Sequence, residues 1–337
     1  MSIKVAINGF GRIGRCTLRA IYEQGLQNEF EVVAINASGD LATNAHLLKY
    51  DTTHGRFATS VETEGENVII IDGKKIPFYS TKDPKGVNWG SHGVDVLLEC
   101  TGAYTTKAKA QALLDQGARR VLISAPGGDD VDTTIVMGVN EEVLRGDMTV
   151  VSNASCTTNC LAPVAKILAD SVGIKQGLMT TIHAYTGDQN LLDAPHSDLR
   201  RARSAAINIV PTSTGAAKAI ALVLPELKGK LDGYALRVPT PTGSATDLTF
   251  EAARETTVEE VNAIVKAAAE GPLKGILAYS EDPIVSTDIV TNPASCIFDA
   301  PLTKVIGNQV KIVGWYDNEW GYSNRLVDLT KLVGASL

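Results

Sequence analysis

A glycine-rich turn between a short apolar strand and a helix is the feature that most restricts how this chain can fold. Ile3–Asn8 has the character of a strand and Arg12–Gln24 that of a helix. The first glycine of the turn permits a tight bend, the second lets the backbone approach a pyrophosphate, and the third lets the helix pack closely on the strand. Free amides at the start of the helix favour anions. The pattern therefore predicts a dinucleotide site at Gly9, Phe10, Gly11, Arg12, Ile13 and Gly14.

The rest of the first half alternates strands with helical stretches. Apolar runs at Glu31–Asn36, Val94–Cys100 and Arg120–Ser124 read as strands, and Thr106–Gln116 reads as a helix. This alternation favours parallel strands joined by crossover helices, which is an α/β fold with a Rossmann-like, doubly wound sheet. Asp72-Gly73, between two further apolar runs, predicts an added β-hairpin.

The second half has longer strand-like segments and fewer helices. Leu178–His183, Tyr234–Val238, Ala245–Glu251 and Val310–Tyr316 are the clearest of them. They favour an α+β catalytic domain with a mixed, largely antiparallel sheet. A chain of 337 residues is too long for one ordinary core. We therefore expect a dinucleotide-binding domain over residues 1–155 and a catalytic domain over residues 156–320, followed by a helix over 321–337.

Charge and cysteine content restrict the partners and the compartment. The net charge of −7 argues against a general nucleic-acid or anionic-membrane binder, so we expect neither partner. The first residues lead into a strand without the apolar stretch of a signal peptide, and no apolar stretch approaches membrane-spanning length. An odd number of scattered cysteines fits a reducing compartment, and we expect the cytoplasm. The cysteines are Cys16, Cys100, Cys156, Cys160 and Cys296.

One cysteine has an unusual setting. Cys156 follows the strand Thr149–Ser152 and lies among polar residues that commonly cap helices. A cysteine at a helix start is expected to have a lowered pKa and a favoured thiolate. The alternative is an inert buried thiol, which suits the other four cysteines better. Cys160 could form a metal or redox pair with Cys156, but no further ligands stand at short spacing, so we expect no metal.

A histidine and several arginines add the elements of a phosphate site. His183 ends a strand and is a candidate base, although a lone histidine is usually structural. Hydroxyl groups, arginines and a helix start together favour phosphate binding. For any single arginine, a solvated helix face is an equally good interpretation. These residues are Thr186, Asp188, Arg200, Arg201, Arg203, Arg237 and the turn Thr212-Ser213-Thr214-Gly215.

Over essentially its full length the chain resembles phosphorylating glyceraldehyde-3-phosphate dehydrogenases. The resemblance rests on Asn8–Arg15, Ala154–Asn159, His183–Thr186 and Trp315–Tyr322. It implies that Cys156 is the nucleophile and His183 its base. It also implies that the last helix returns to the first domain, and that the family's homotetramer places the 186–203 loop near a neighbour's cofactor.

The resemblance also implies the ligand-binding residues. Those for the C3 phosphate are Thr186, Asp188 and Arg237, and those for inorganic phosphate are Ser155, Arg201, Thr214 and Gly215, with Thr157 beside them. Cofactor residues beyond the glycine-rich turn are Asn36, Ala37, Ser38, Lys82, Thr101, Gly102, Ser124, Asn318 and Tyr322. Among them, the resemblance implies that Asn318 bonds the nicotinamide carboxamide and that Tyr322 packs beside the ring.

The implied reaction oxidises glyceraldehyde 3-phosphate with NAD(P)⁺ and inorganic phosphate. The Cys156 thiolate adds to the aldehyde, hydride leaves, and phosphate cleaves the resulting thioester to give 1,3-bisphosphoglycerate, in glycolysis or gluconeogenesis. Three other interpretations stay open. They are oxidation of erythrose 4-phosphate, a non-enzymatic binding role that retains the fold, and a Cys–His hydrolase, which would leave the glycine-rich turn unexplained.

The cofactor preference depends on the residues after the second strand. A carboxylate that binds the ribose hydroxyls is expected there, but Ala37 takes its place, and Asp40 is the nearest substitute. Lys82 could supply a cation, and Ala194 leaves space where NAD-specific relatives carry leucine. Pro195, however, is the residue found in NAD-specific relatives. We expect use of both NAD and NADP, leaning to NADP.

Overall fold

The computed structural model describes residues 2–83 and 85–337 and divides them into two compact units. The first unit comprises the chain up to Ile135, Glu141–Ala154 and Ser323–Leu337. The second comprises Val136–Asn140 and Ser155–Tyr322. Most of the last helix, α7 (Trp320–Ala335), therefore belongs to the first unit.

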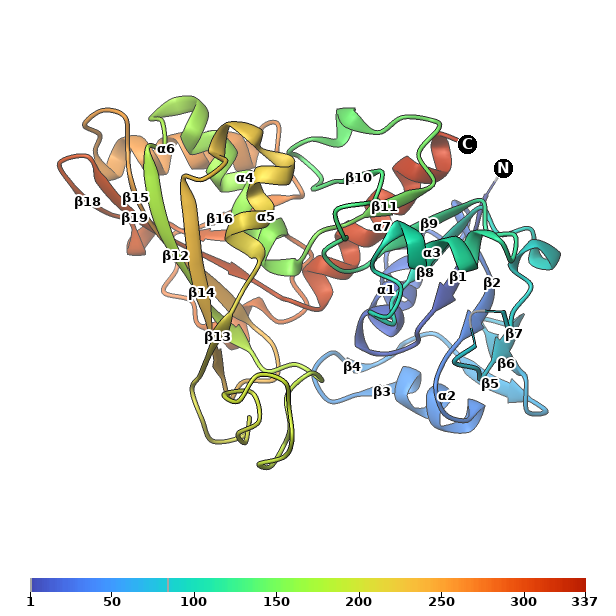
Figure 1. Ribbon diagram of the computed structural model, residues 1–337. Helices are drawn as coiled ribbons and strands as arrows, with labels where there is room; N and C mark the ends of the chain where they lie inside the picture. Colours follow the sequence, from blue (N-terminus) through green and yellow to red (C-terminus); the bar gives the residue numbers. More distant parts are fainter. Residues whose placement is uncertain (1, 84) are drawn as a thin grey trace. The chain divides into compact units, whose positions relative to one another are not determined.

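The first unit is built on a nine-stranded sheet (Figure 1). Its strands β10, β11, β9, β8, β1, β2 and β7 lie in this order and pair in parallel, so the expected doubly wound α/β sheet is confirmed. The strands of this unit are β1 (Ile3–Asn8), β2 (Phe30–Asn36), β3 (Tyr50–Asp51), β4 (Gly55–Arg56), β5 (Val61–Glu64), β6 (Val68–Ile71), β7 (Lys74–Tyr79), β8 (Val96–Glu99), β9 (Arg120–Ile123), β10 (Thr133–Thr134) and β11 (Val150–Ser152). Its helices, besides α7, are α1 (Arg12–Glu23), α2 (Leu41–Lys49) and α3 (Lys107–Leu114).

The expected hairpin is present and widens this sheet. β6 and β7 pair antiparallel, and the turn between them has positive φ at Asp72 (52°) and Gly73 (74°). Positive φ at both central residues is the requirement of a type I′ turn, which Asp-Gly meets readily. β7 also pairs in parallel with β2, so the hairpin continues the dinucleotide-binding sheet.

The second unit contains an eight-stranded sheet in the order β13-β14-β12-β15-β19-β17-β16, with β18 paired to β19. β12 and β14 are parallel, as are β16 and β17, whereas the other pairs are antiparallel. The expectation of a mixed, largely antiparallel sheet is confirmed. The strands are β12 (Gln176–Ala184), β13 (Val210–Ser213), β14 (Leu231–Val238), β15 (Ser244–Glu251), β16 (Leu277–Ser280), β17 (Cys296–Asp299), β18 (Lys304–Ile306) and β19 (Gln309–Tyr316).

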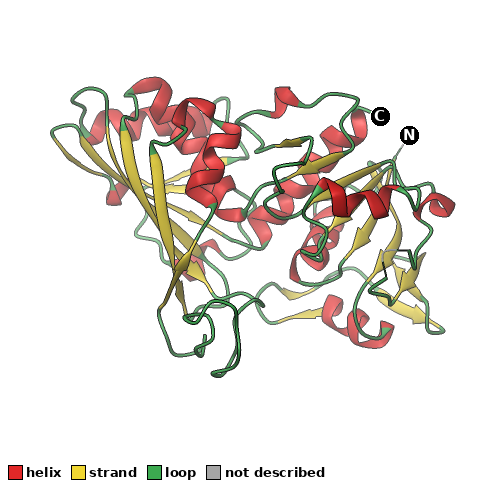
Figure 2. Ribbon diagram, viewed as in Figure 1, coloured by secondary structure: helices red, strands yellow, loops and turns green. Residues whose placement is uncertain are grey.

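The helices of the second unit pack on one face of this sheet (Figure 2). They are α4 (Cys156–Ser171), α5 (Ala216–Val223) and α6 (Val258–Glu270). Side chains alternate between the faces of β12, because successive residues of a strand point to opposite sides. Met179, Thr181 and His183 are buried on the helix-covered face, whereas Leu178 on the other face is 70% exposed. This alternation directs His183 towards the face on which α4 lies.

Short 3₁₀ helices complete the chain at Trp89–His92, Glu141–Val143, Pro225–Leu227, Ser286–Ile289 and Ala300–Leu302. Within the described ranges, no helix combines the length and apolar character needed to cross a membrane.

Candidate active site

The turn between β11 and α4 presents Cys156. Ser152 Oγ accepts the amide of Ala154, and Ser155 caps the helix by accepting the amide of Thr158 at 3.0 Å. Cys156 is therefore the first residue of α4, as the capping pattern predicts. Ala154 has a φ of 55°, a left-handed conformation uncommon for a residue with a Cβ. This turn directs the backbone from the end of β11 into α4.

Cys156 and His183 form a hydrogen-bonded pair. Cys156 Sγ lies 3.4 Å from His183 Nε2, and His183 Nδ1 lies 2.7 Å from the carbonyl oxygen of Ala184. A carbonyl can only accept, so Nδ1 carries the proton and Nε2 is left with a lone pair directed at the thiol. Arg237 Nη1 donates to the Ala184 carbonyl and to Thr186 Oγ1. It also lies 3.0 Å from Nδ1, but makes no hydrogen bond there because both nitrogens carry protons.

The electrostatics of this pair differ from the expectation for a cysteine at a helix start. Burial raises the pKa of the Cys156 thiol, and Arg237 and the amide of Thr157 only partly offset it. Burial and the nearby charge of Arg237 lower the pKa of His183 to about 3. The expected lowering of the thiol pKa is thus outweighed, because the cost of burying a thiolate exceeds the stabilisation from the helix amides and Arg237.

The buried side chain of Tyr316 packs beside the Cys156–His183 pair. The Tyr316 hydroxyl hydrogen-bonds to Thr157 Oγ1 and Thr181 Oγ1, each at 2.8 Å, and its ring packs edge-on against His183. These contacts join α4, β12 and β19. Thr157, expected beside the inorganic phosphate, hydrogen-bonds to Tyr316 through its buried hydroxyl. Sequence reasoning missed Tyr316, whose partners are far away in the sequence.

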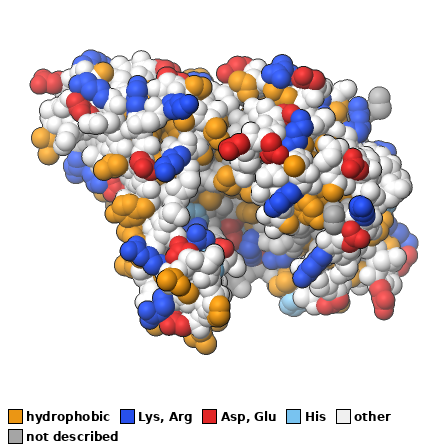
Figure 3. Space-filling view, viewed as in Figure 1, with side chains coloured by type: hydrophobic (Ala, Val, Ile, Leu, Met, Phe, Trp, Pro, Cys, Tyr) orange, Lys and Arg blue, Asp and Glu red, His pale blue; other side chains and the backbone are white. Residues whose placement is uncertain are grey.

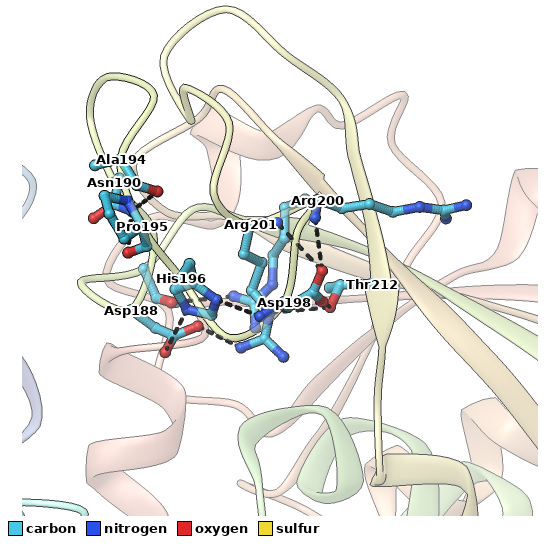
Figure 4. A network of polar contacts seen from close by, with 11 residues as sticks. Asp188, Asn190, Ala194, Pro195, His196, Asp198, Arg200, Arg201 and Thr212 are labelled. Atoms are coloured by element: carbon cyan, nitrogen blue, oxygen red, sulfur yellow. Dashed lines mark hydrogen bonds and ion pairs between the residues drawn. The ribbon is translucent and has the colours of Figure 1, made fainter.

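Two of the expected phosphate residues bind each other (Figure 4). Arg201 forms an ion pair with Asp188 through Nη1, and its Nε contacts Asp198 at 3.2 Å and Thr212 at 3.0 Å. His196 also lies near Asp188, and it accepts the amide of Asp198. Burial alone would raise the pKa of Asp188, but its bonds with Arg201 and His196 lower it. Asp188 is therefore an ionised partner of Arg201, which orients and partly neutralises that guanidinium.

Thr214, Gly215 and Arg203, which are also candidates for phosphate binding, lie in different surroundings. Thr214 and Gly215 lie at the start of α5, where Thr214 Oγ1 accepts the amide of Ala216. Arg203 forms an exposed ion pair with Asp193.

The glycine-rich turn has the geometry of a dinucleotide site. A Cβ on Gly14 would lie 2.2 Å from the carbonyl oxygen of Gly9, and one on Gly9 would lie 2.6 Å from the backbone of Cys100. Both positions therefore require glycine. A Cβ on Gly11 would meet no atom within 4 Å, so the space beside the second glycine is open. These three environments match the three functions that the fingerprint predicts.

A cavity of about 410 Å³ in the first unit gathers most of the expected cofactor residues. Arg12, Ile13, Gly14, Gly102 and Ser124 do not line it. The expected residues that do line it are Gly9, Phe10, Gly11, Asn36, Ala37, Ser38, Lys82 and Thr101.

Arg12 has a partner close to the glycine-rich turn. Its guanidinium forms an ion pair with Asp51. Burial alone would raise the pKa of Asp51, but Arg12 and the amide of His54 hold it at about 2.

Polar residues at the carboxyl ends of the parallel strands organise the cavity. Asn36 donates to Asn8 Oδ1 and accepts the amide of Thr81, while Asn8 donates to Glu99 at 2.6 Å. Ser124 hydrogen-bonds to the Cys100 thiol, whose pKa burial raises to about 12. Sequence reasoning missed Asn8 and Glu99, although the rule that ligands bind at the carboxyl ends of parallel strands could have found both.

Asn318 and Tyr322 lie in the second unit at the junction of β19 and α7. Both are buried, and Asn318 Oδ1 accepts from Ser244 Oγ at 2.8 Å.

Comparisons with known proteins agree on one family. The N-terminal NAD-binding domain of glyceraldehyde 3-phosphate dehydrogenase matches residues 3–107, and the C-terminal domain of that enzyme matches residues 155–318. Among curated relatives, glyceraldehyde-3-phosphate dehydrogenase of Mycolicibacterium smegmatis is 62% identical, with 100% of each chain covered. Glyceraldehyde-3-phosphate dehydrogenase 2 of Streptomyces avermitilis is 60% identical over 100% of each chain. A plasmid-encoded glyceraldehyde-3-phosphate dehydrogenase of Cupriavidus necator is 59% identical over 97% of each.

Proposed function

The chain belongs to the glyceraldehyde-3-phosphate dehydrogenase family, and on that premise we propose that Cys156 and His183 carry out its chemistry. It is an oxidoreductase of glycolysis that acts on glyceraldehyde 3-phosphate and uses NAD(H). The observation that carries the assignment is the 3.4 Å contact between Cys156 Sγ and the unprotonated Nε2 of His183.

The arrangement supports proton transfer in two stages. His183 Nε2 takes the thiol proton as Cys156 Sγ bonds to the aldehyde carbon, and returns it to the carbonyl oxygen, which gives a hemithioacetal and leaves Nε2 unprotonated again. It then takes the hemithioacetal hydroxyl proton as the hydride leaves, which gives a thioester. The backbone amide of Cys156, at the first turn of α4, would stabilise the developing oxyanion. The nicotinamide cofactor, held by the residues of the first-unit cavity, supplies the hydride acceptor when bound.

Inorganic phosphate then cleaves the thioester. Arg237 and Thr186, which contact each other at 3.4 Å beside His183, would hold the C3 phosphate of the substrate. Arg201, Ser155, Thr214 and Gly215 would bind the attacking phosphate, with Asp188 as the partner that orients Arg201.

We expect Cys156→Ser to abolish aldehyde oxidation, because the serine hydroxyl is far less acidic and less nucleophilic than a thiol. His183→Asn should lower kcat by about 10²–10⁴, the usual contribution of a general base. The measurement is the rate of cofactor reduction with saturating aldehyde and phosphate. Cys160→Ser is the matched control, because Cys160 lies in the same helix but is fully buried.

A labelling experiment checks the same assignment independently. Iodoacetamide should modify Cys156 first and inactivate the enzyme in proportion, because Cys156 is partly exposed and can pass its thiol proton to His183 Nε2 at 3.4 Å, whereas Cys16, Cys160 and Cys296 are buried and burial raises the pKa of Cys100 to about 12. Inactivation that followed labelling of another cysteine, or an active Cys156→Ser enzyme, would overturn the proposal.

We also infer that the enzyme accepts both NAD and NADP, with a lean to NADP. Ala37 lines the cavity where a carboxylate would otherwise bind the ribose hydroxyls, and Ser38 and Lys82 line the same region. A 2′-phosphate would therefore meet a hydroxyl and a cation there. Asp83 also lines the cavity and opposes this preference.

We further propose that the protein is a homotetramer. Large apolar side chains are exposed on the bare face of the second sheet, where Tyr234 is 51% exposed beside Leu178. Others lie on or just beyond the 186–203 loop, whose surface is rich in orange hydrophobic groups at the lower left of Figure 3. Extended apolar surface of this kind is typical of subunit interfaces. The exposed side chains of this region are Leu191, Leu192, Leu199, Ile207 and Ile209.

A further inference from the structure

A buried group of polar side chains surrounds Asn318, the residue expected to bind the nicotinamide carboxamide. Ser244, Thr242 and Asp317 are each at most 3% exposed, and Asn318 is 5% exposed. Asn318 Oδ1 lies 2.8 Å from Ser244 Oγ and 3.3 Å from Thr242 Oγ1. Any role of this group towards the cofactor rests on the proposed function, because it concerns how Asn318 meets that cofactor.

The hydroxyl protons of Thr242 and Ser244 determine which of the two side chains donates to Asn318. Ser244 Oγ accepts the backbone amide of Ala184 at 3.0 Å, so its own proton is free to go to Asn318 Oδ1. Thr242 Oγ1 lies 2.9 Å from Asp317 Oδ1, a carboxylate oxygen that can only accept. The single proton of Thr242 therefore goes to Asp317, and Ser244 supplies the hydrogen bond to Asn318.

The reversed orientation of the amide is unfavourable. It would place Asn318 Nδ2 against Ser244 Oγ, and the proton of a fully buried serine would then lose its acceptor. An unsatisfied buried donor is destabilising, because it has given up its hydrogen bond to water without gaining another. In the observed orientation, Nδ2 has no acceptor among the described residues and remains available as a donor.

Ser244 is also hydrogen-bonded to Ala184, the residue that follows His183 in β12. Its partner Ala184 donates its amide to Ser244 Oγ and accepts His183 Nδ1–H at its carbonyl. The serine hydroxyl therefore cannot rotate away without leaving the buried Ala184 amide unpaired. Ser244 therefore links β12, the strand that carries His183, to Asn318, whose side-chain amide is expected to contact the cofactor.

We propose that Ser244 is a positioning residue, which orients the Asn318 carboxamide so that its Nδ2 donates to the carbonyl oxygen of the nicotinamide carboxamide. Ser244 does not need to touch the reacting atoms for this effect. The orientation matters because a reversed amide would present an oxygen to that carbonyl, and two acceptors repel.

The test compares Ser244→Ala with Ser295→Ala in the full-length enzyme. Ser295 is a matched control, since it is buried in the same unit and its hydroxyl has no hydrogen-bond partner among the residues that the structure describes. Ser244→Ala should raise the dissociation constant for NAD, measured by titration calorimetry in the absence of aldehyde, about tenfold, the equivalent of 1.4 kcal/mol, with a smaller fall in kcat. Ser295→Ala should leave both values unchanged. Ser244→Thr, which keeps the hydroxyl, should recover most of the loss.

A cofactor analogue separates positioning from a general structural defect. In thionicotinamide adenine dinucleotide a sulfur, which is a weak acceptor, replaces the carbonyl oxygen. Ser244→Ala should therefore lose at least fivefold more kcat/KM with NAD than with the analogue. Equal losses with both cofactors, or no loss relative to Ser295→Ala, would overturn the role of Ser244. If instead the unmodified enzyme oxidised no aldehyde, the proposed function would be the part that fails.

Discussion

At the scale of single residues, Arg237 shifts the pKa of both members of the proposed catalytic pair, Cys156 and His183. Its charge lowers the pKa of the Cys156 thiol, which burial raises, and adds to the burial that lowers the pKa of His183. The free site therefore favours a neutral thiol beside a neutral imidazole. A substrate phosphate bound to Arg237 would offset its charge and raise the basicity of His183. Substrate binding would thus raise the proton affinity of His183 before its imidazole accepts a proton.

The proposed cofactor preference rests mainly on Ala37, which directly follows β2. Ala37→Asp should shift the ratio of kcat/KM for NAD over NADP upward by at least roughly tenfold, the equivalent of 1.4 kcal/mol. The reason is that a carboxylate gains hydrogen bonds from the ribose hydroxyls and repels a 2′-phosphate, by roughly 4 kcal/mol at about 4 Å and an effective dielectric near 20. Steady-state rates with both cofactors measure the ratio.

Ala42→Asp is the control for this substitution. It adds the same charge at an exposed position in the first turn of α2, outside the cavity, and should leave the ratio unchanged. An unmodified enzyme that used NAD alone, with no measurable rate on NADP, would refute the dual preference.

At the scale of elements, the start of α4 has two functions. Ser155 satisfies the amide of Thr158 through its side chain, and its backbone carbonyl accepts from Asn159 Nδ2. The cap therefore stabilises the helix and fixes the backbone that carries Cys156. Because Ser155 is also a candidate for binding inorganic phosphate, its effects on stability and on activity must be separated.

A second capped helix in the same unit allows that separation. Thr257 caps α6 by accepting the amide of Glu260, and it lies outside the proposed site. Ser155→Ala and Thr257→Ala should each lower the free energy of unfolding by about 1 kcal/mol, the usual cost of losing a cap. Only Ser155→Ala should also raise the KM for phosphate. Denaturant unfolding and steady-state rates provide the two measurements, and equal effects on KM would argue against a site at Ser155.

The elements that sequence could predict are those with local signals. The strand, turn and helix around Gly9–Gly14, the hairpin at Asp72-Gly73 and the helix start at Cys156 all depend on residues close together in the chain. β12 begins at Gln176, earlier than expected, because its ladders with β14 and β15 extend it. The limits of a strand depend on its partners, which local sequence does not reveal.

The site was predictable only in part, for a similar reason. Cys156 and His183 could be singled out as candidates from their local settings, but the directions of their pKa shifts depend on burial by distant elements. The pairing of Tyr316 with Thr157 joins residues 159 positions apart. That of Ser244 with Asn318 joins residues 74 positions apart. Such contacts require the complete sheet.

At the scale of the whole molecule, the second sheet is covered on one face only. α4, α5 and α6 bury the face that carries His183, while the opposite face exposes Leu178 and Tyr234 on the neighbouring strands β12 and β14. A half-covered sheet is common in antiparallel folds, but its free face is then usually polar. Large apolar side chains on that face favour contact with another copy of the chain.

Charged substitutions on that face test the assembly. The double variant Leu178→Asp with Tyr234→Asp should convert tetramers into smaller species, because burying two unpaired carboxylates per subunit costs more than a standard interface of roughly 800 Å² per partner can easily tolerate. Sedimentation velocity measures the mass, and thermal unfolding confirms that each subunit stays folded. Ile306→Asp is the control, since Ile306 is 80% exposed at the end of β18 in the same unit. A tetramer that survived the double variant would place its interfaces elsewhere, and an unmodified monomer would refute the assembly altogether.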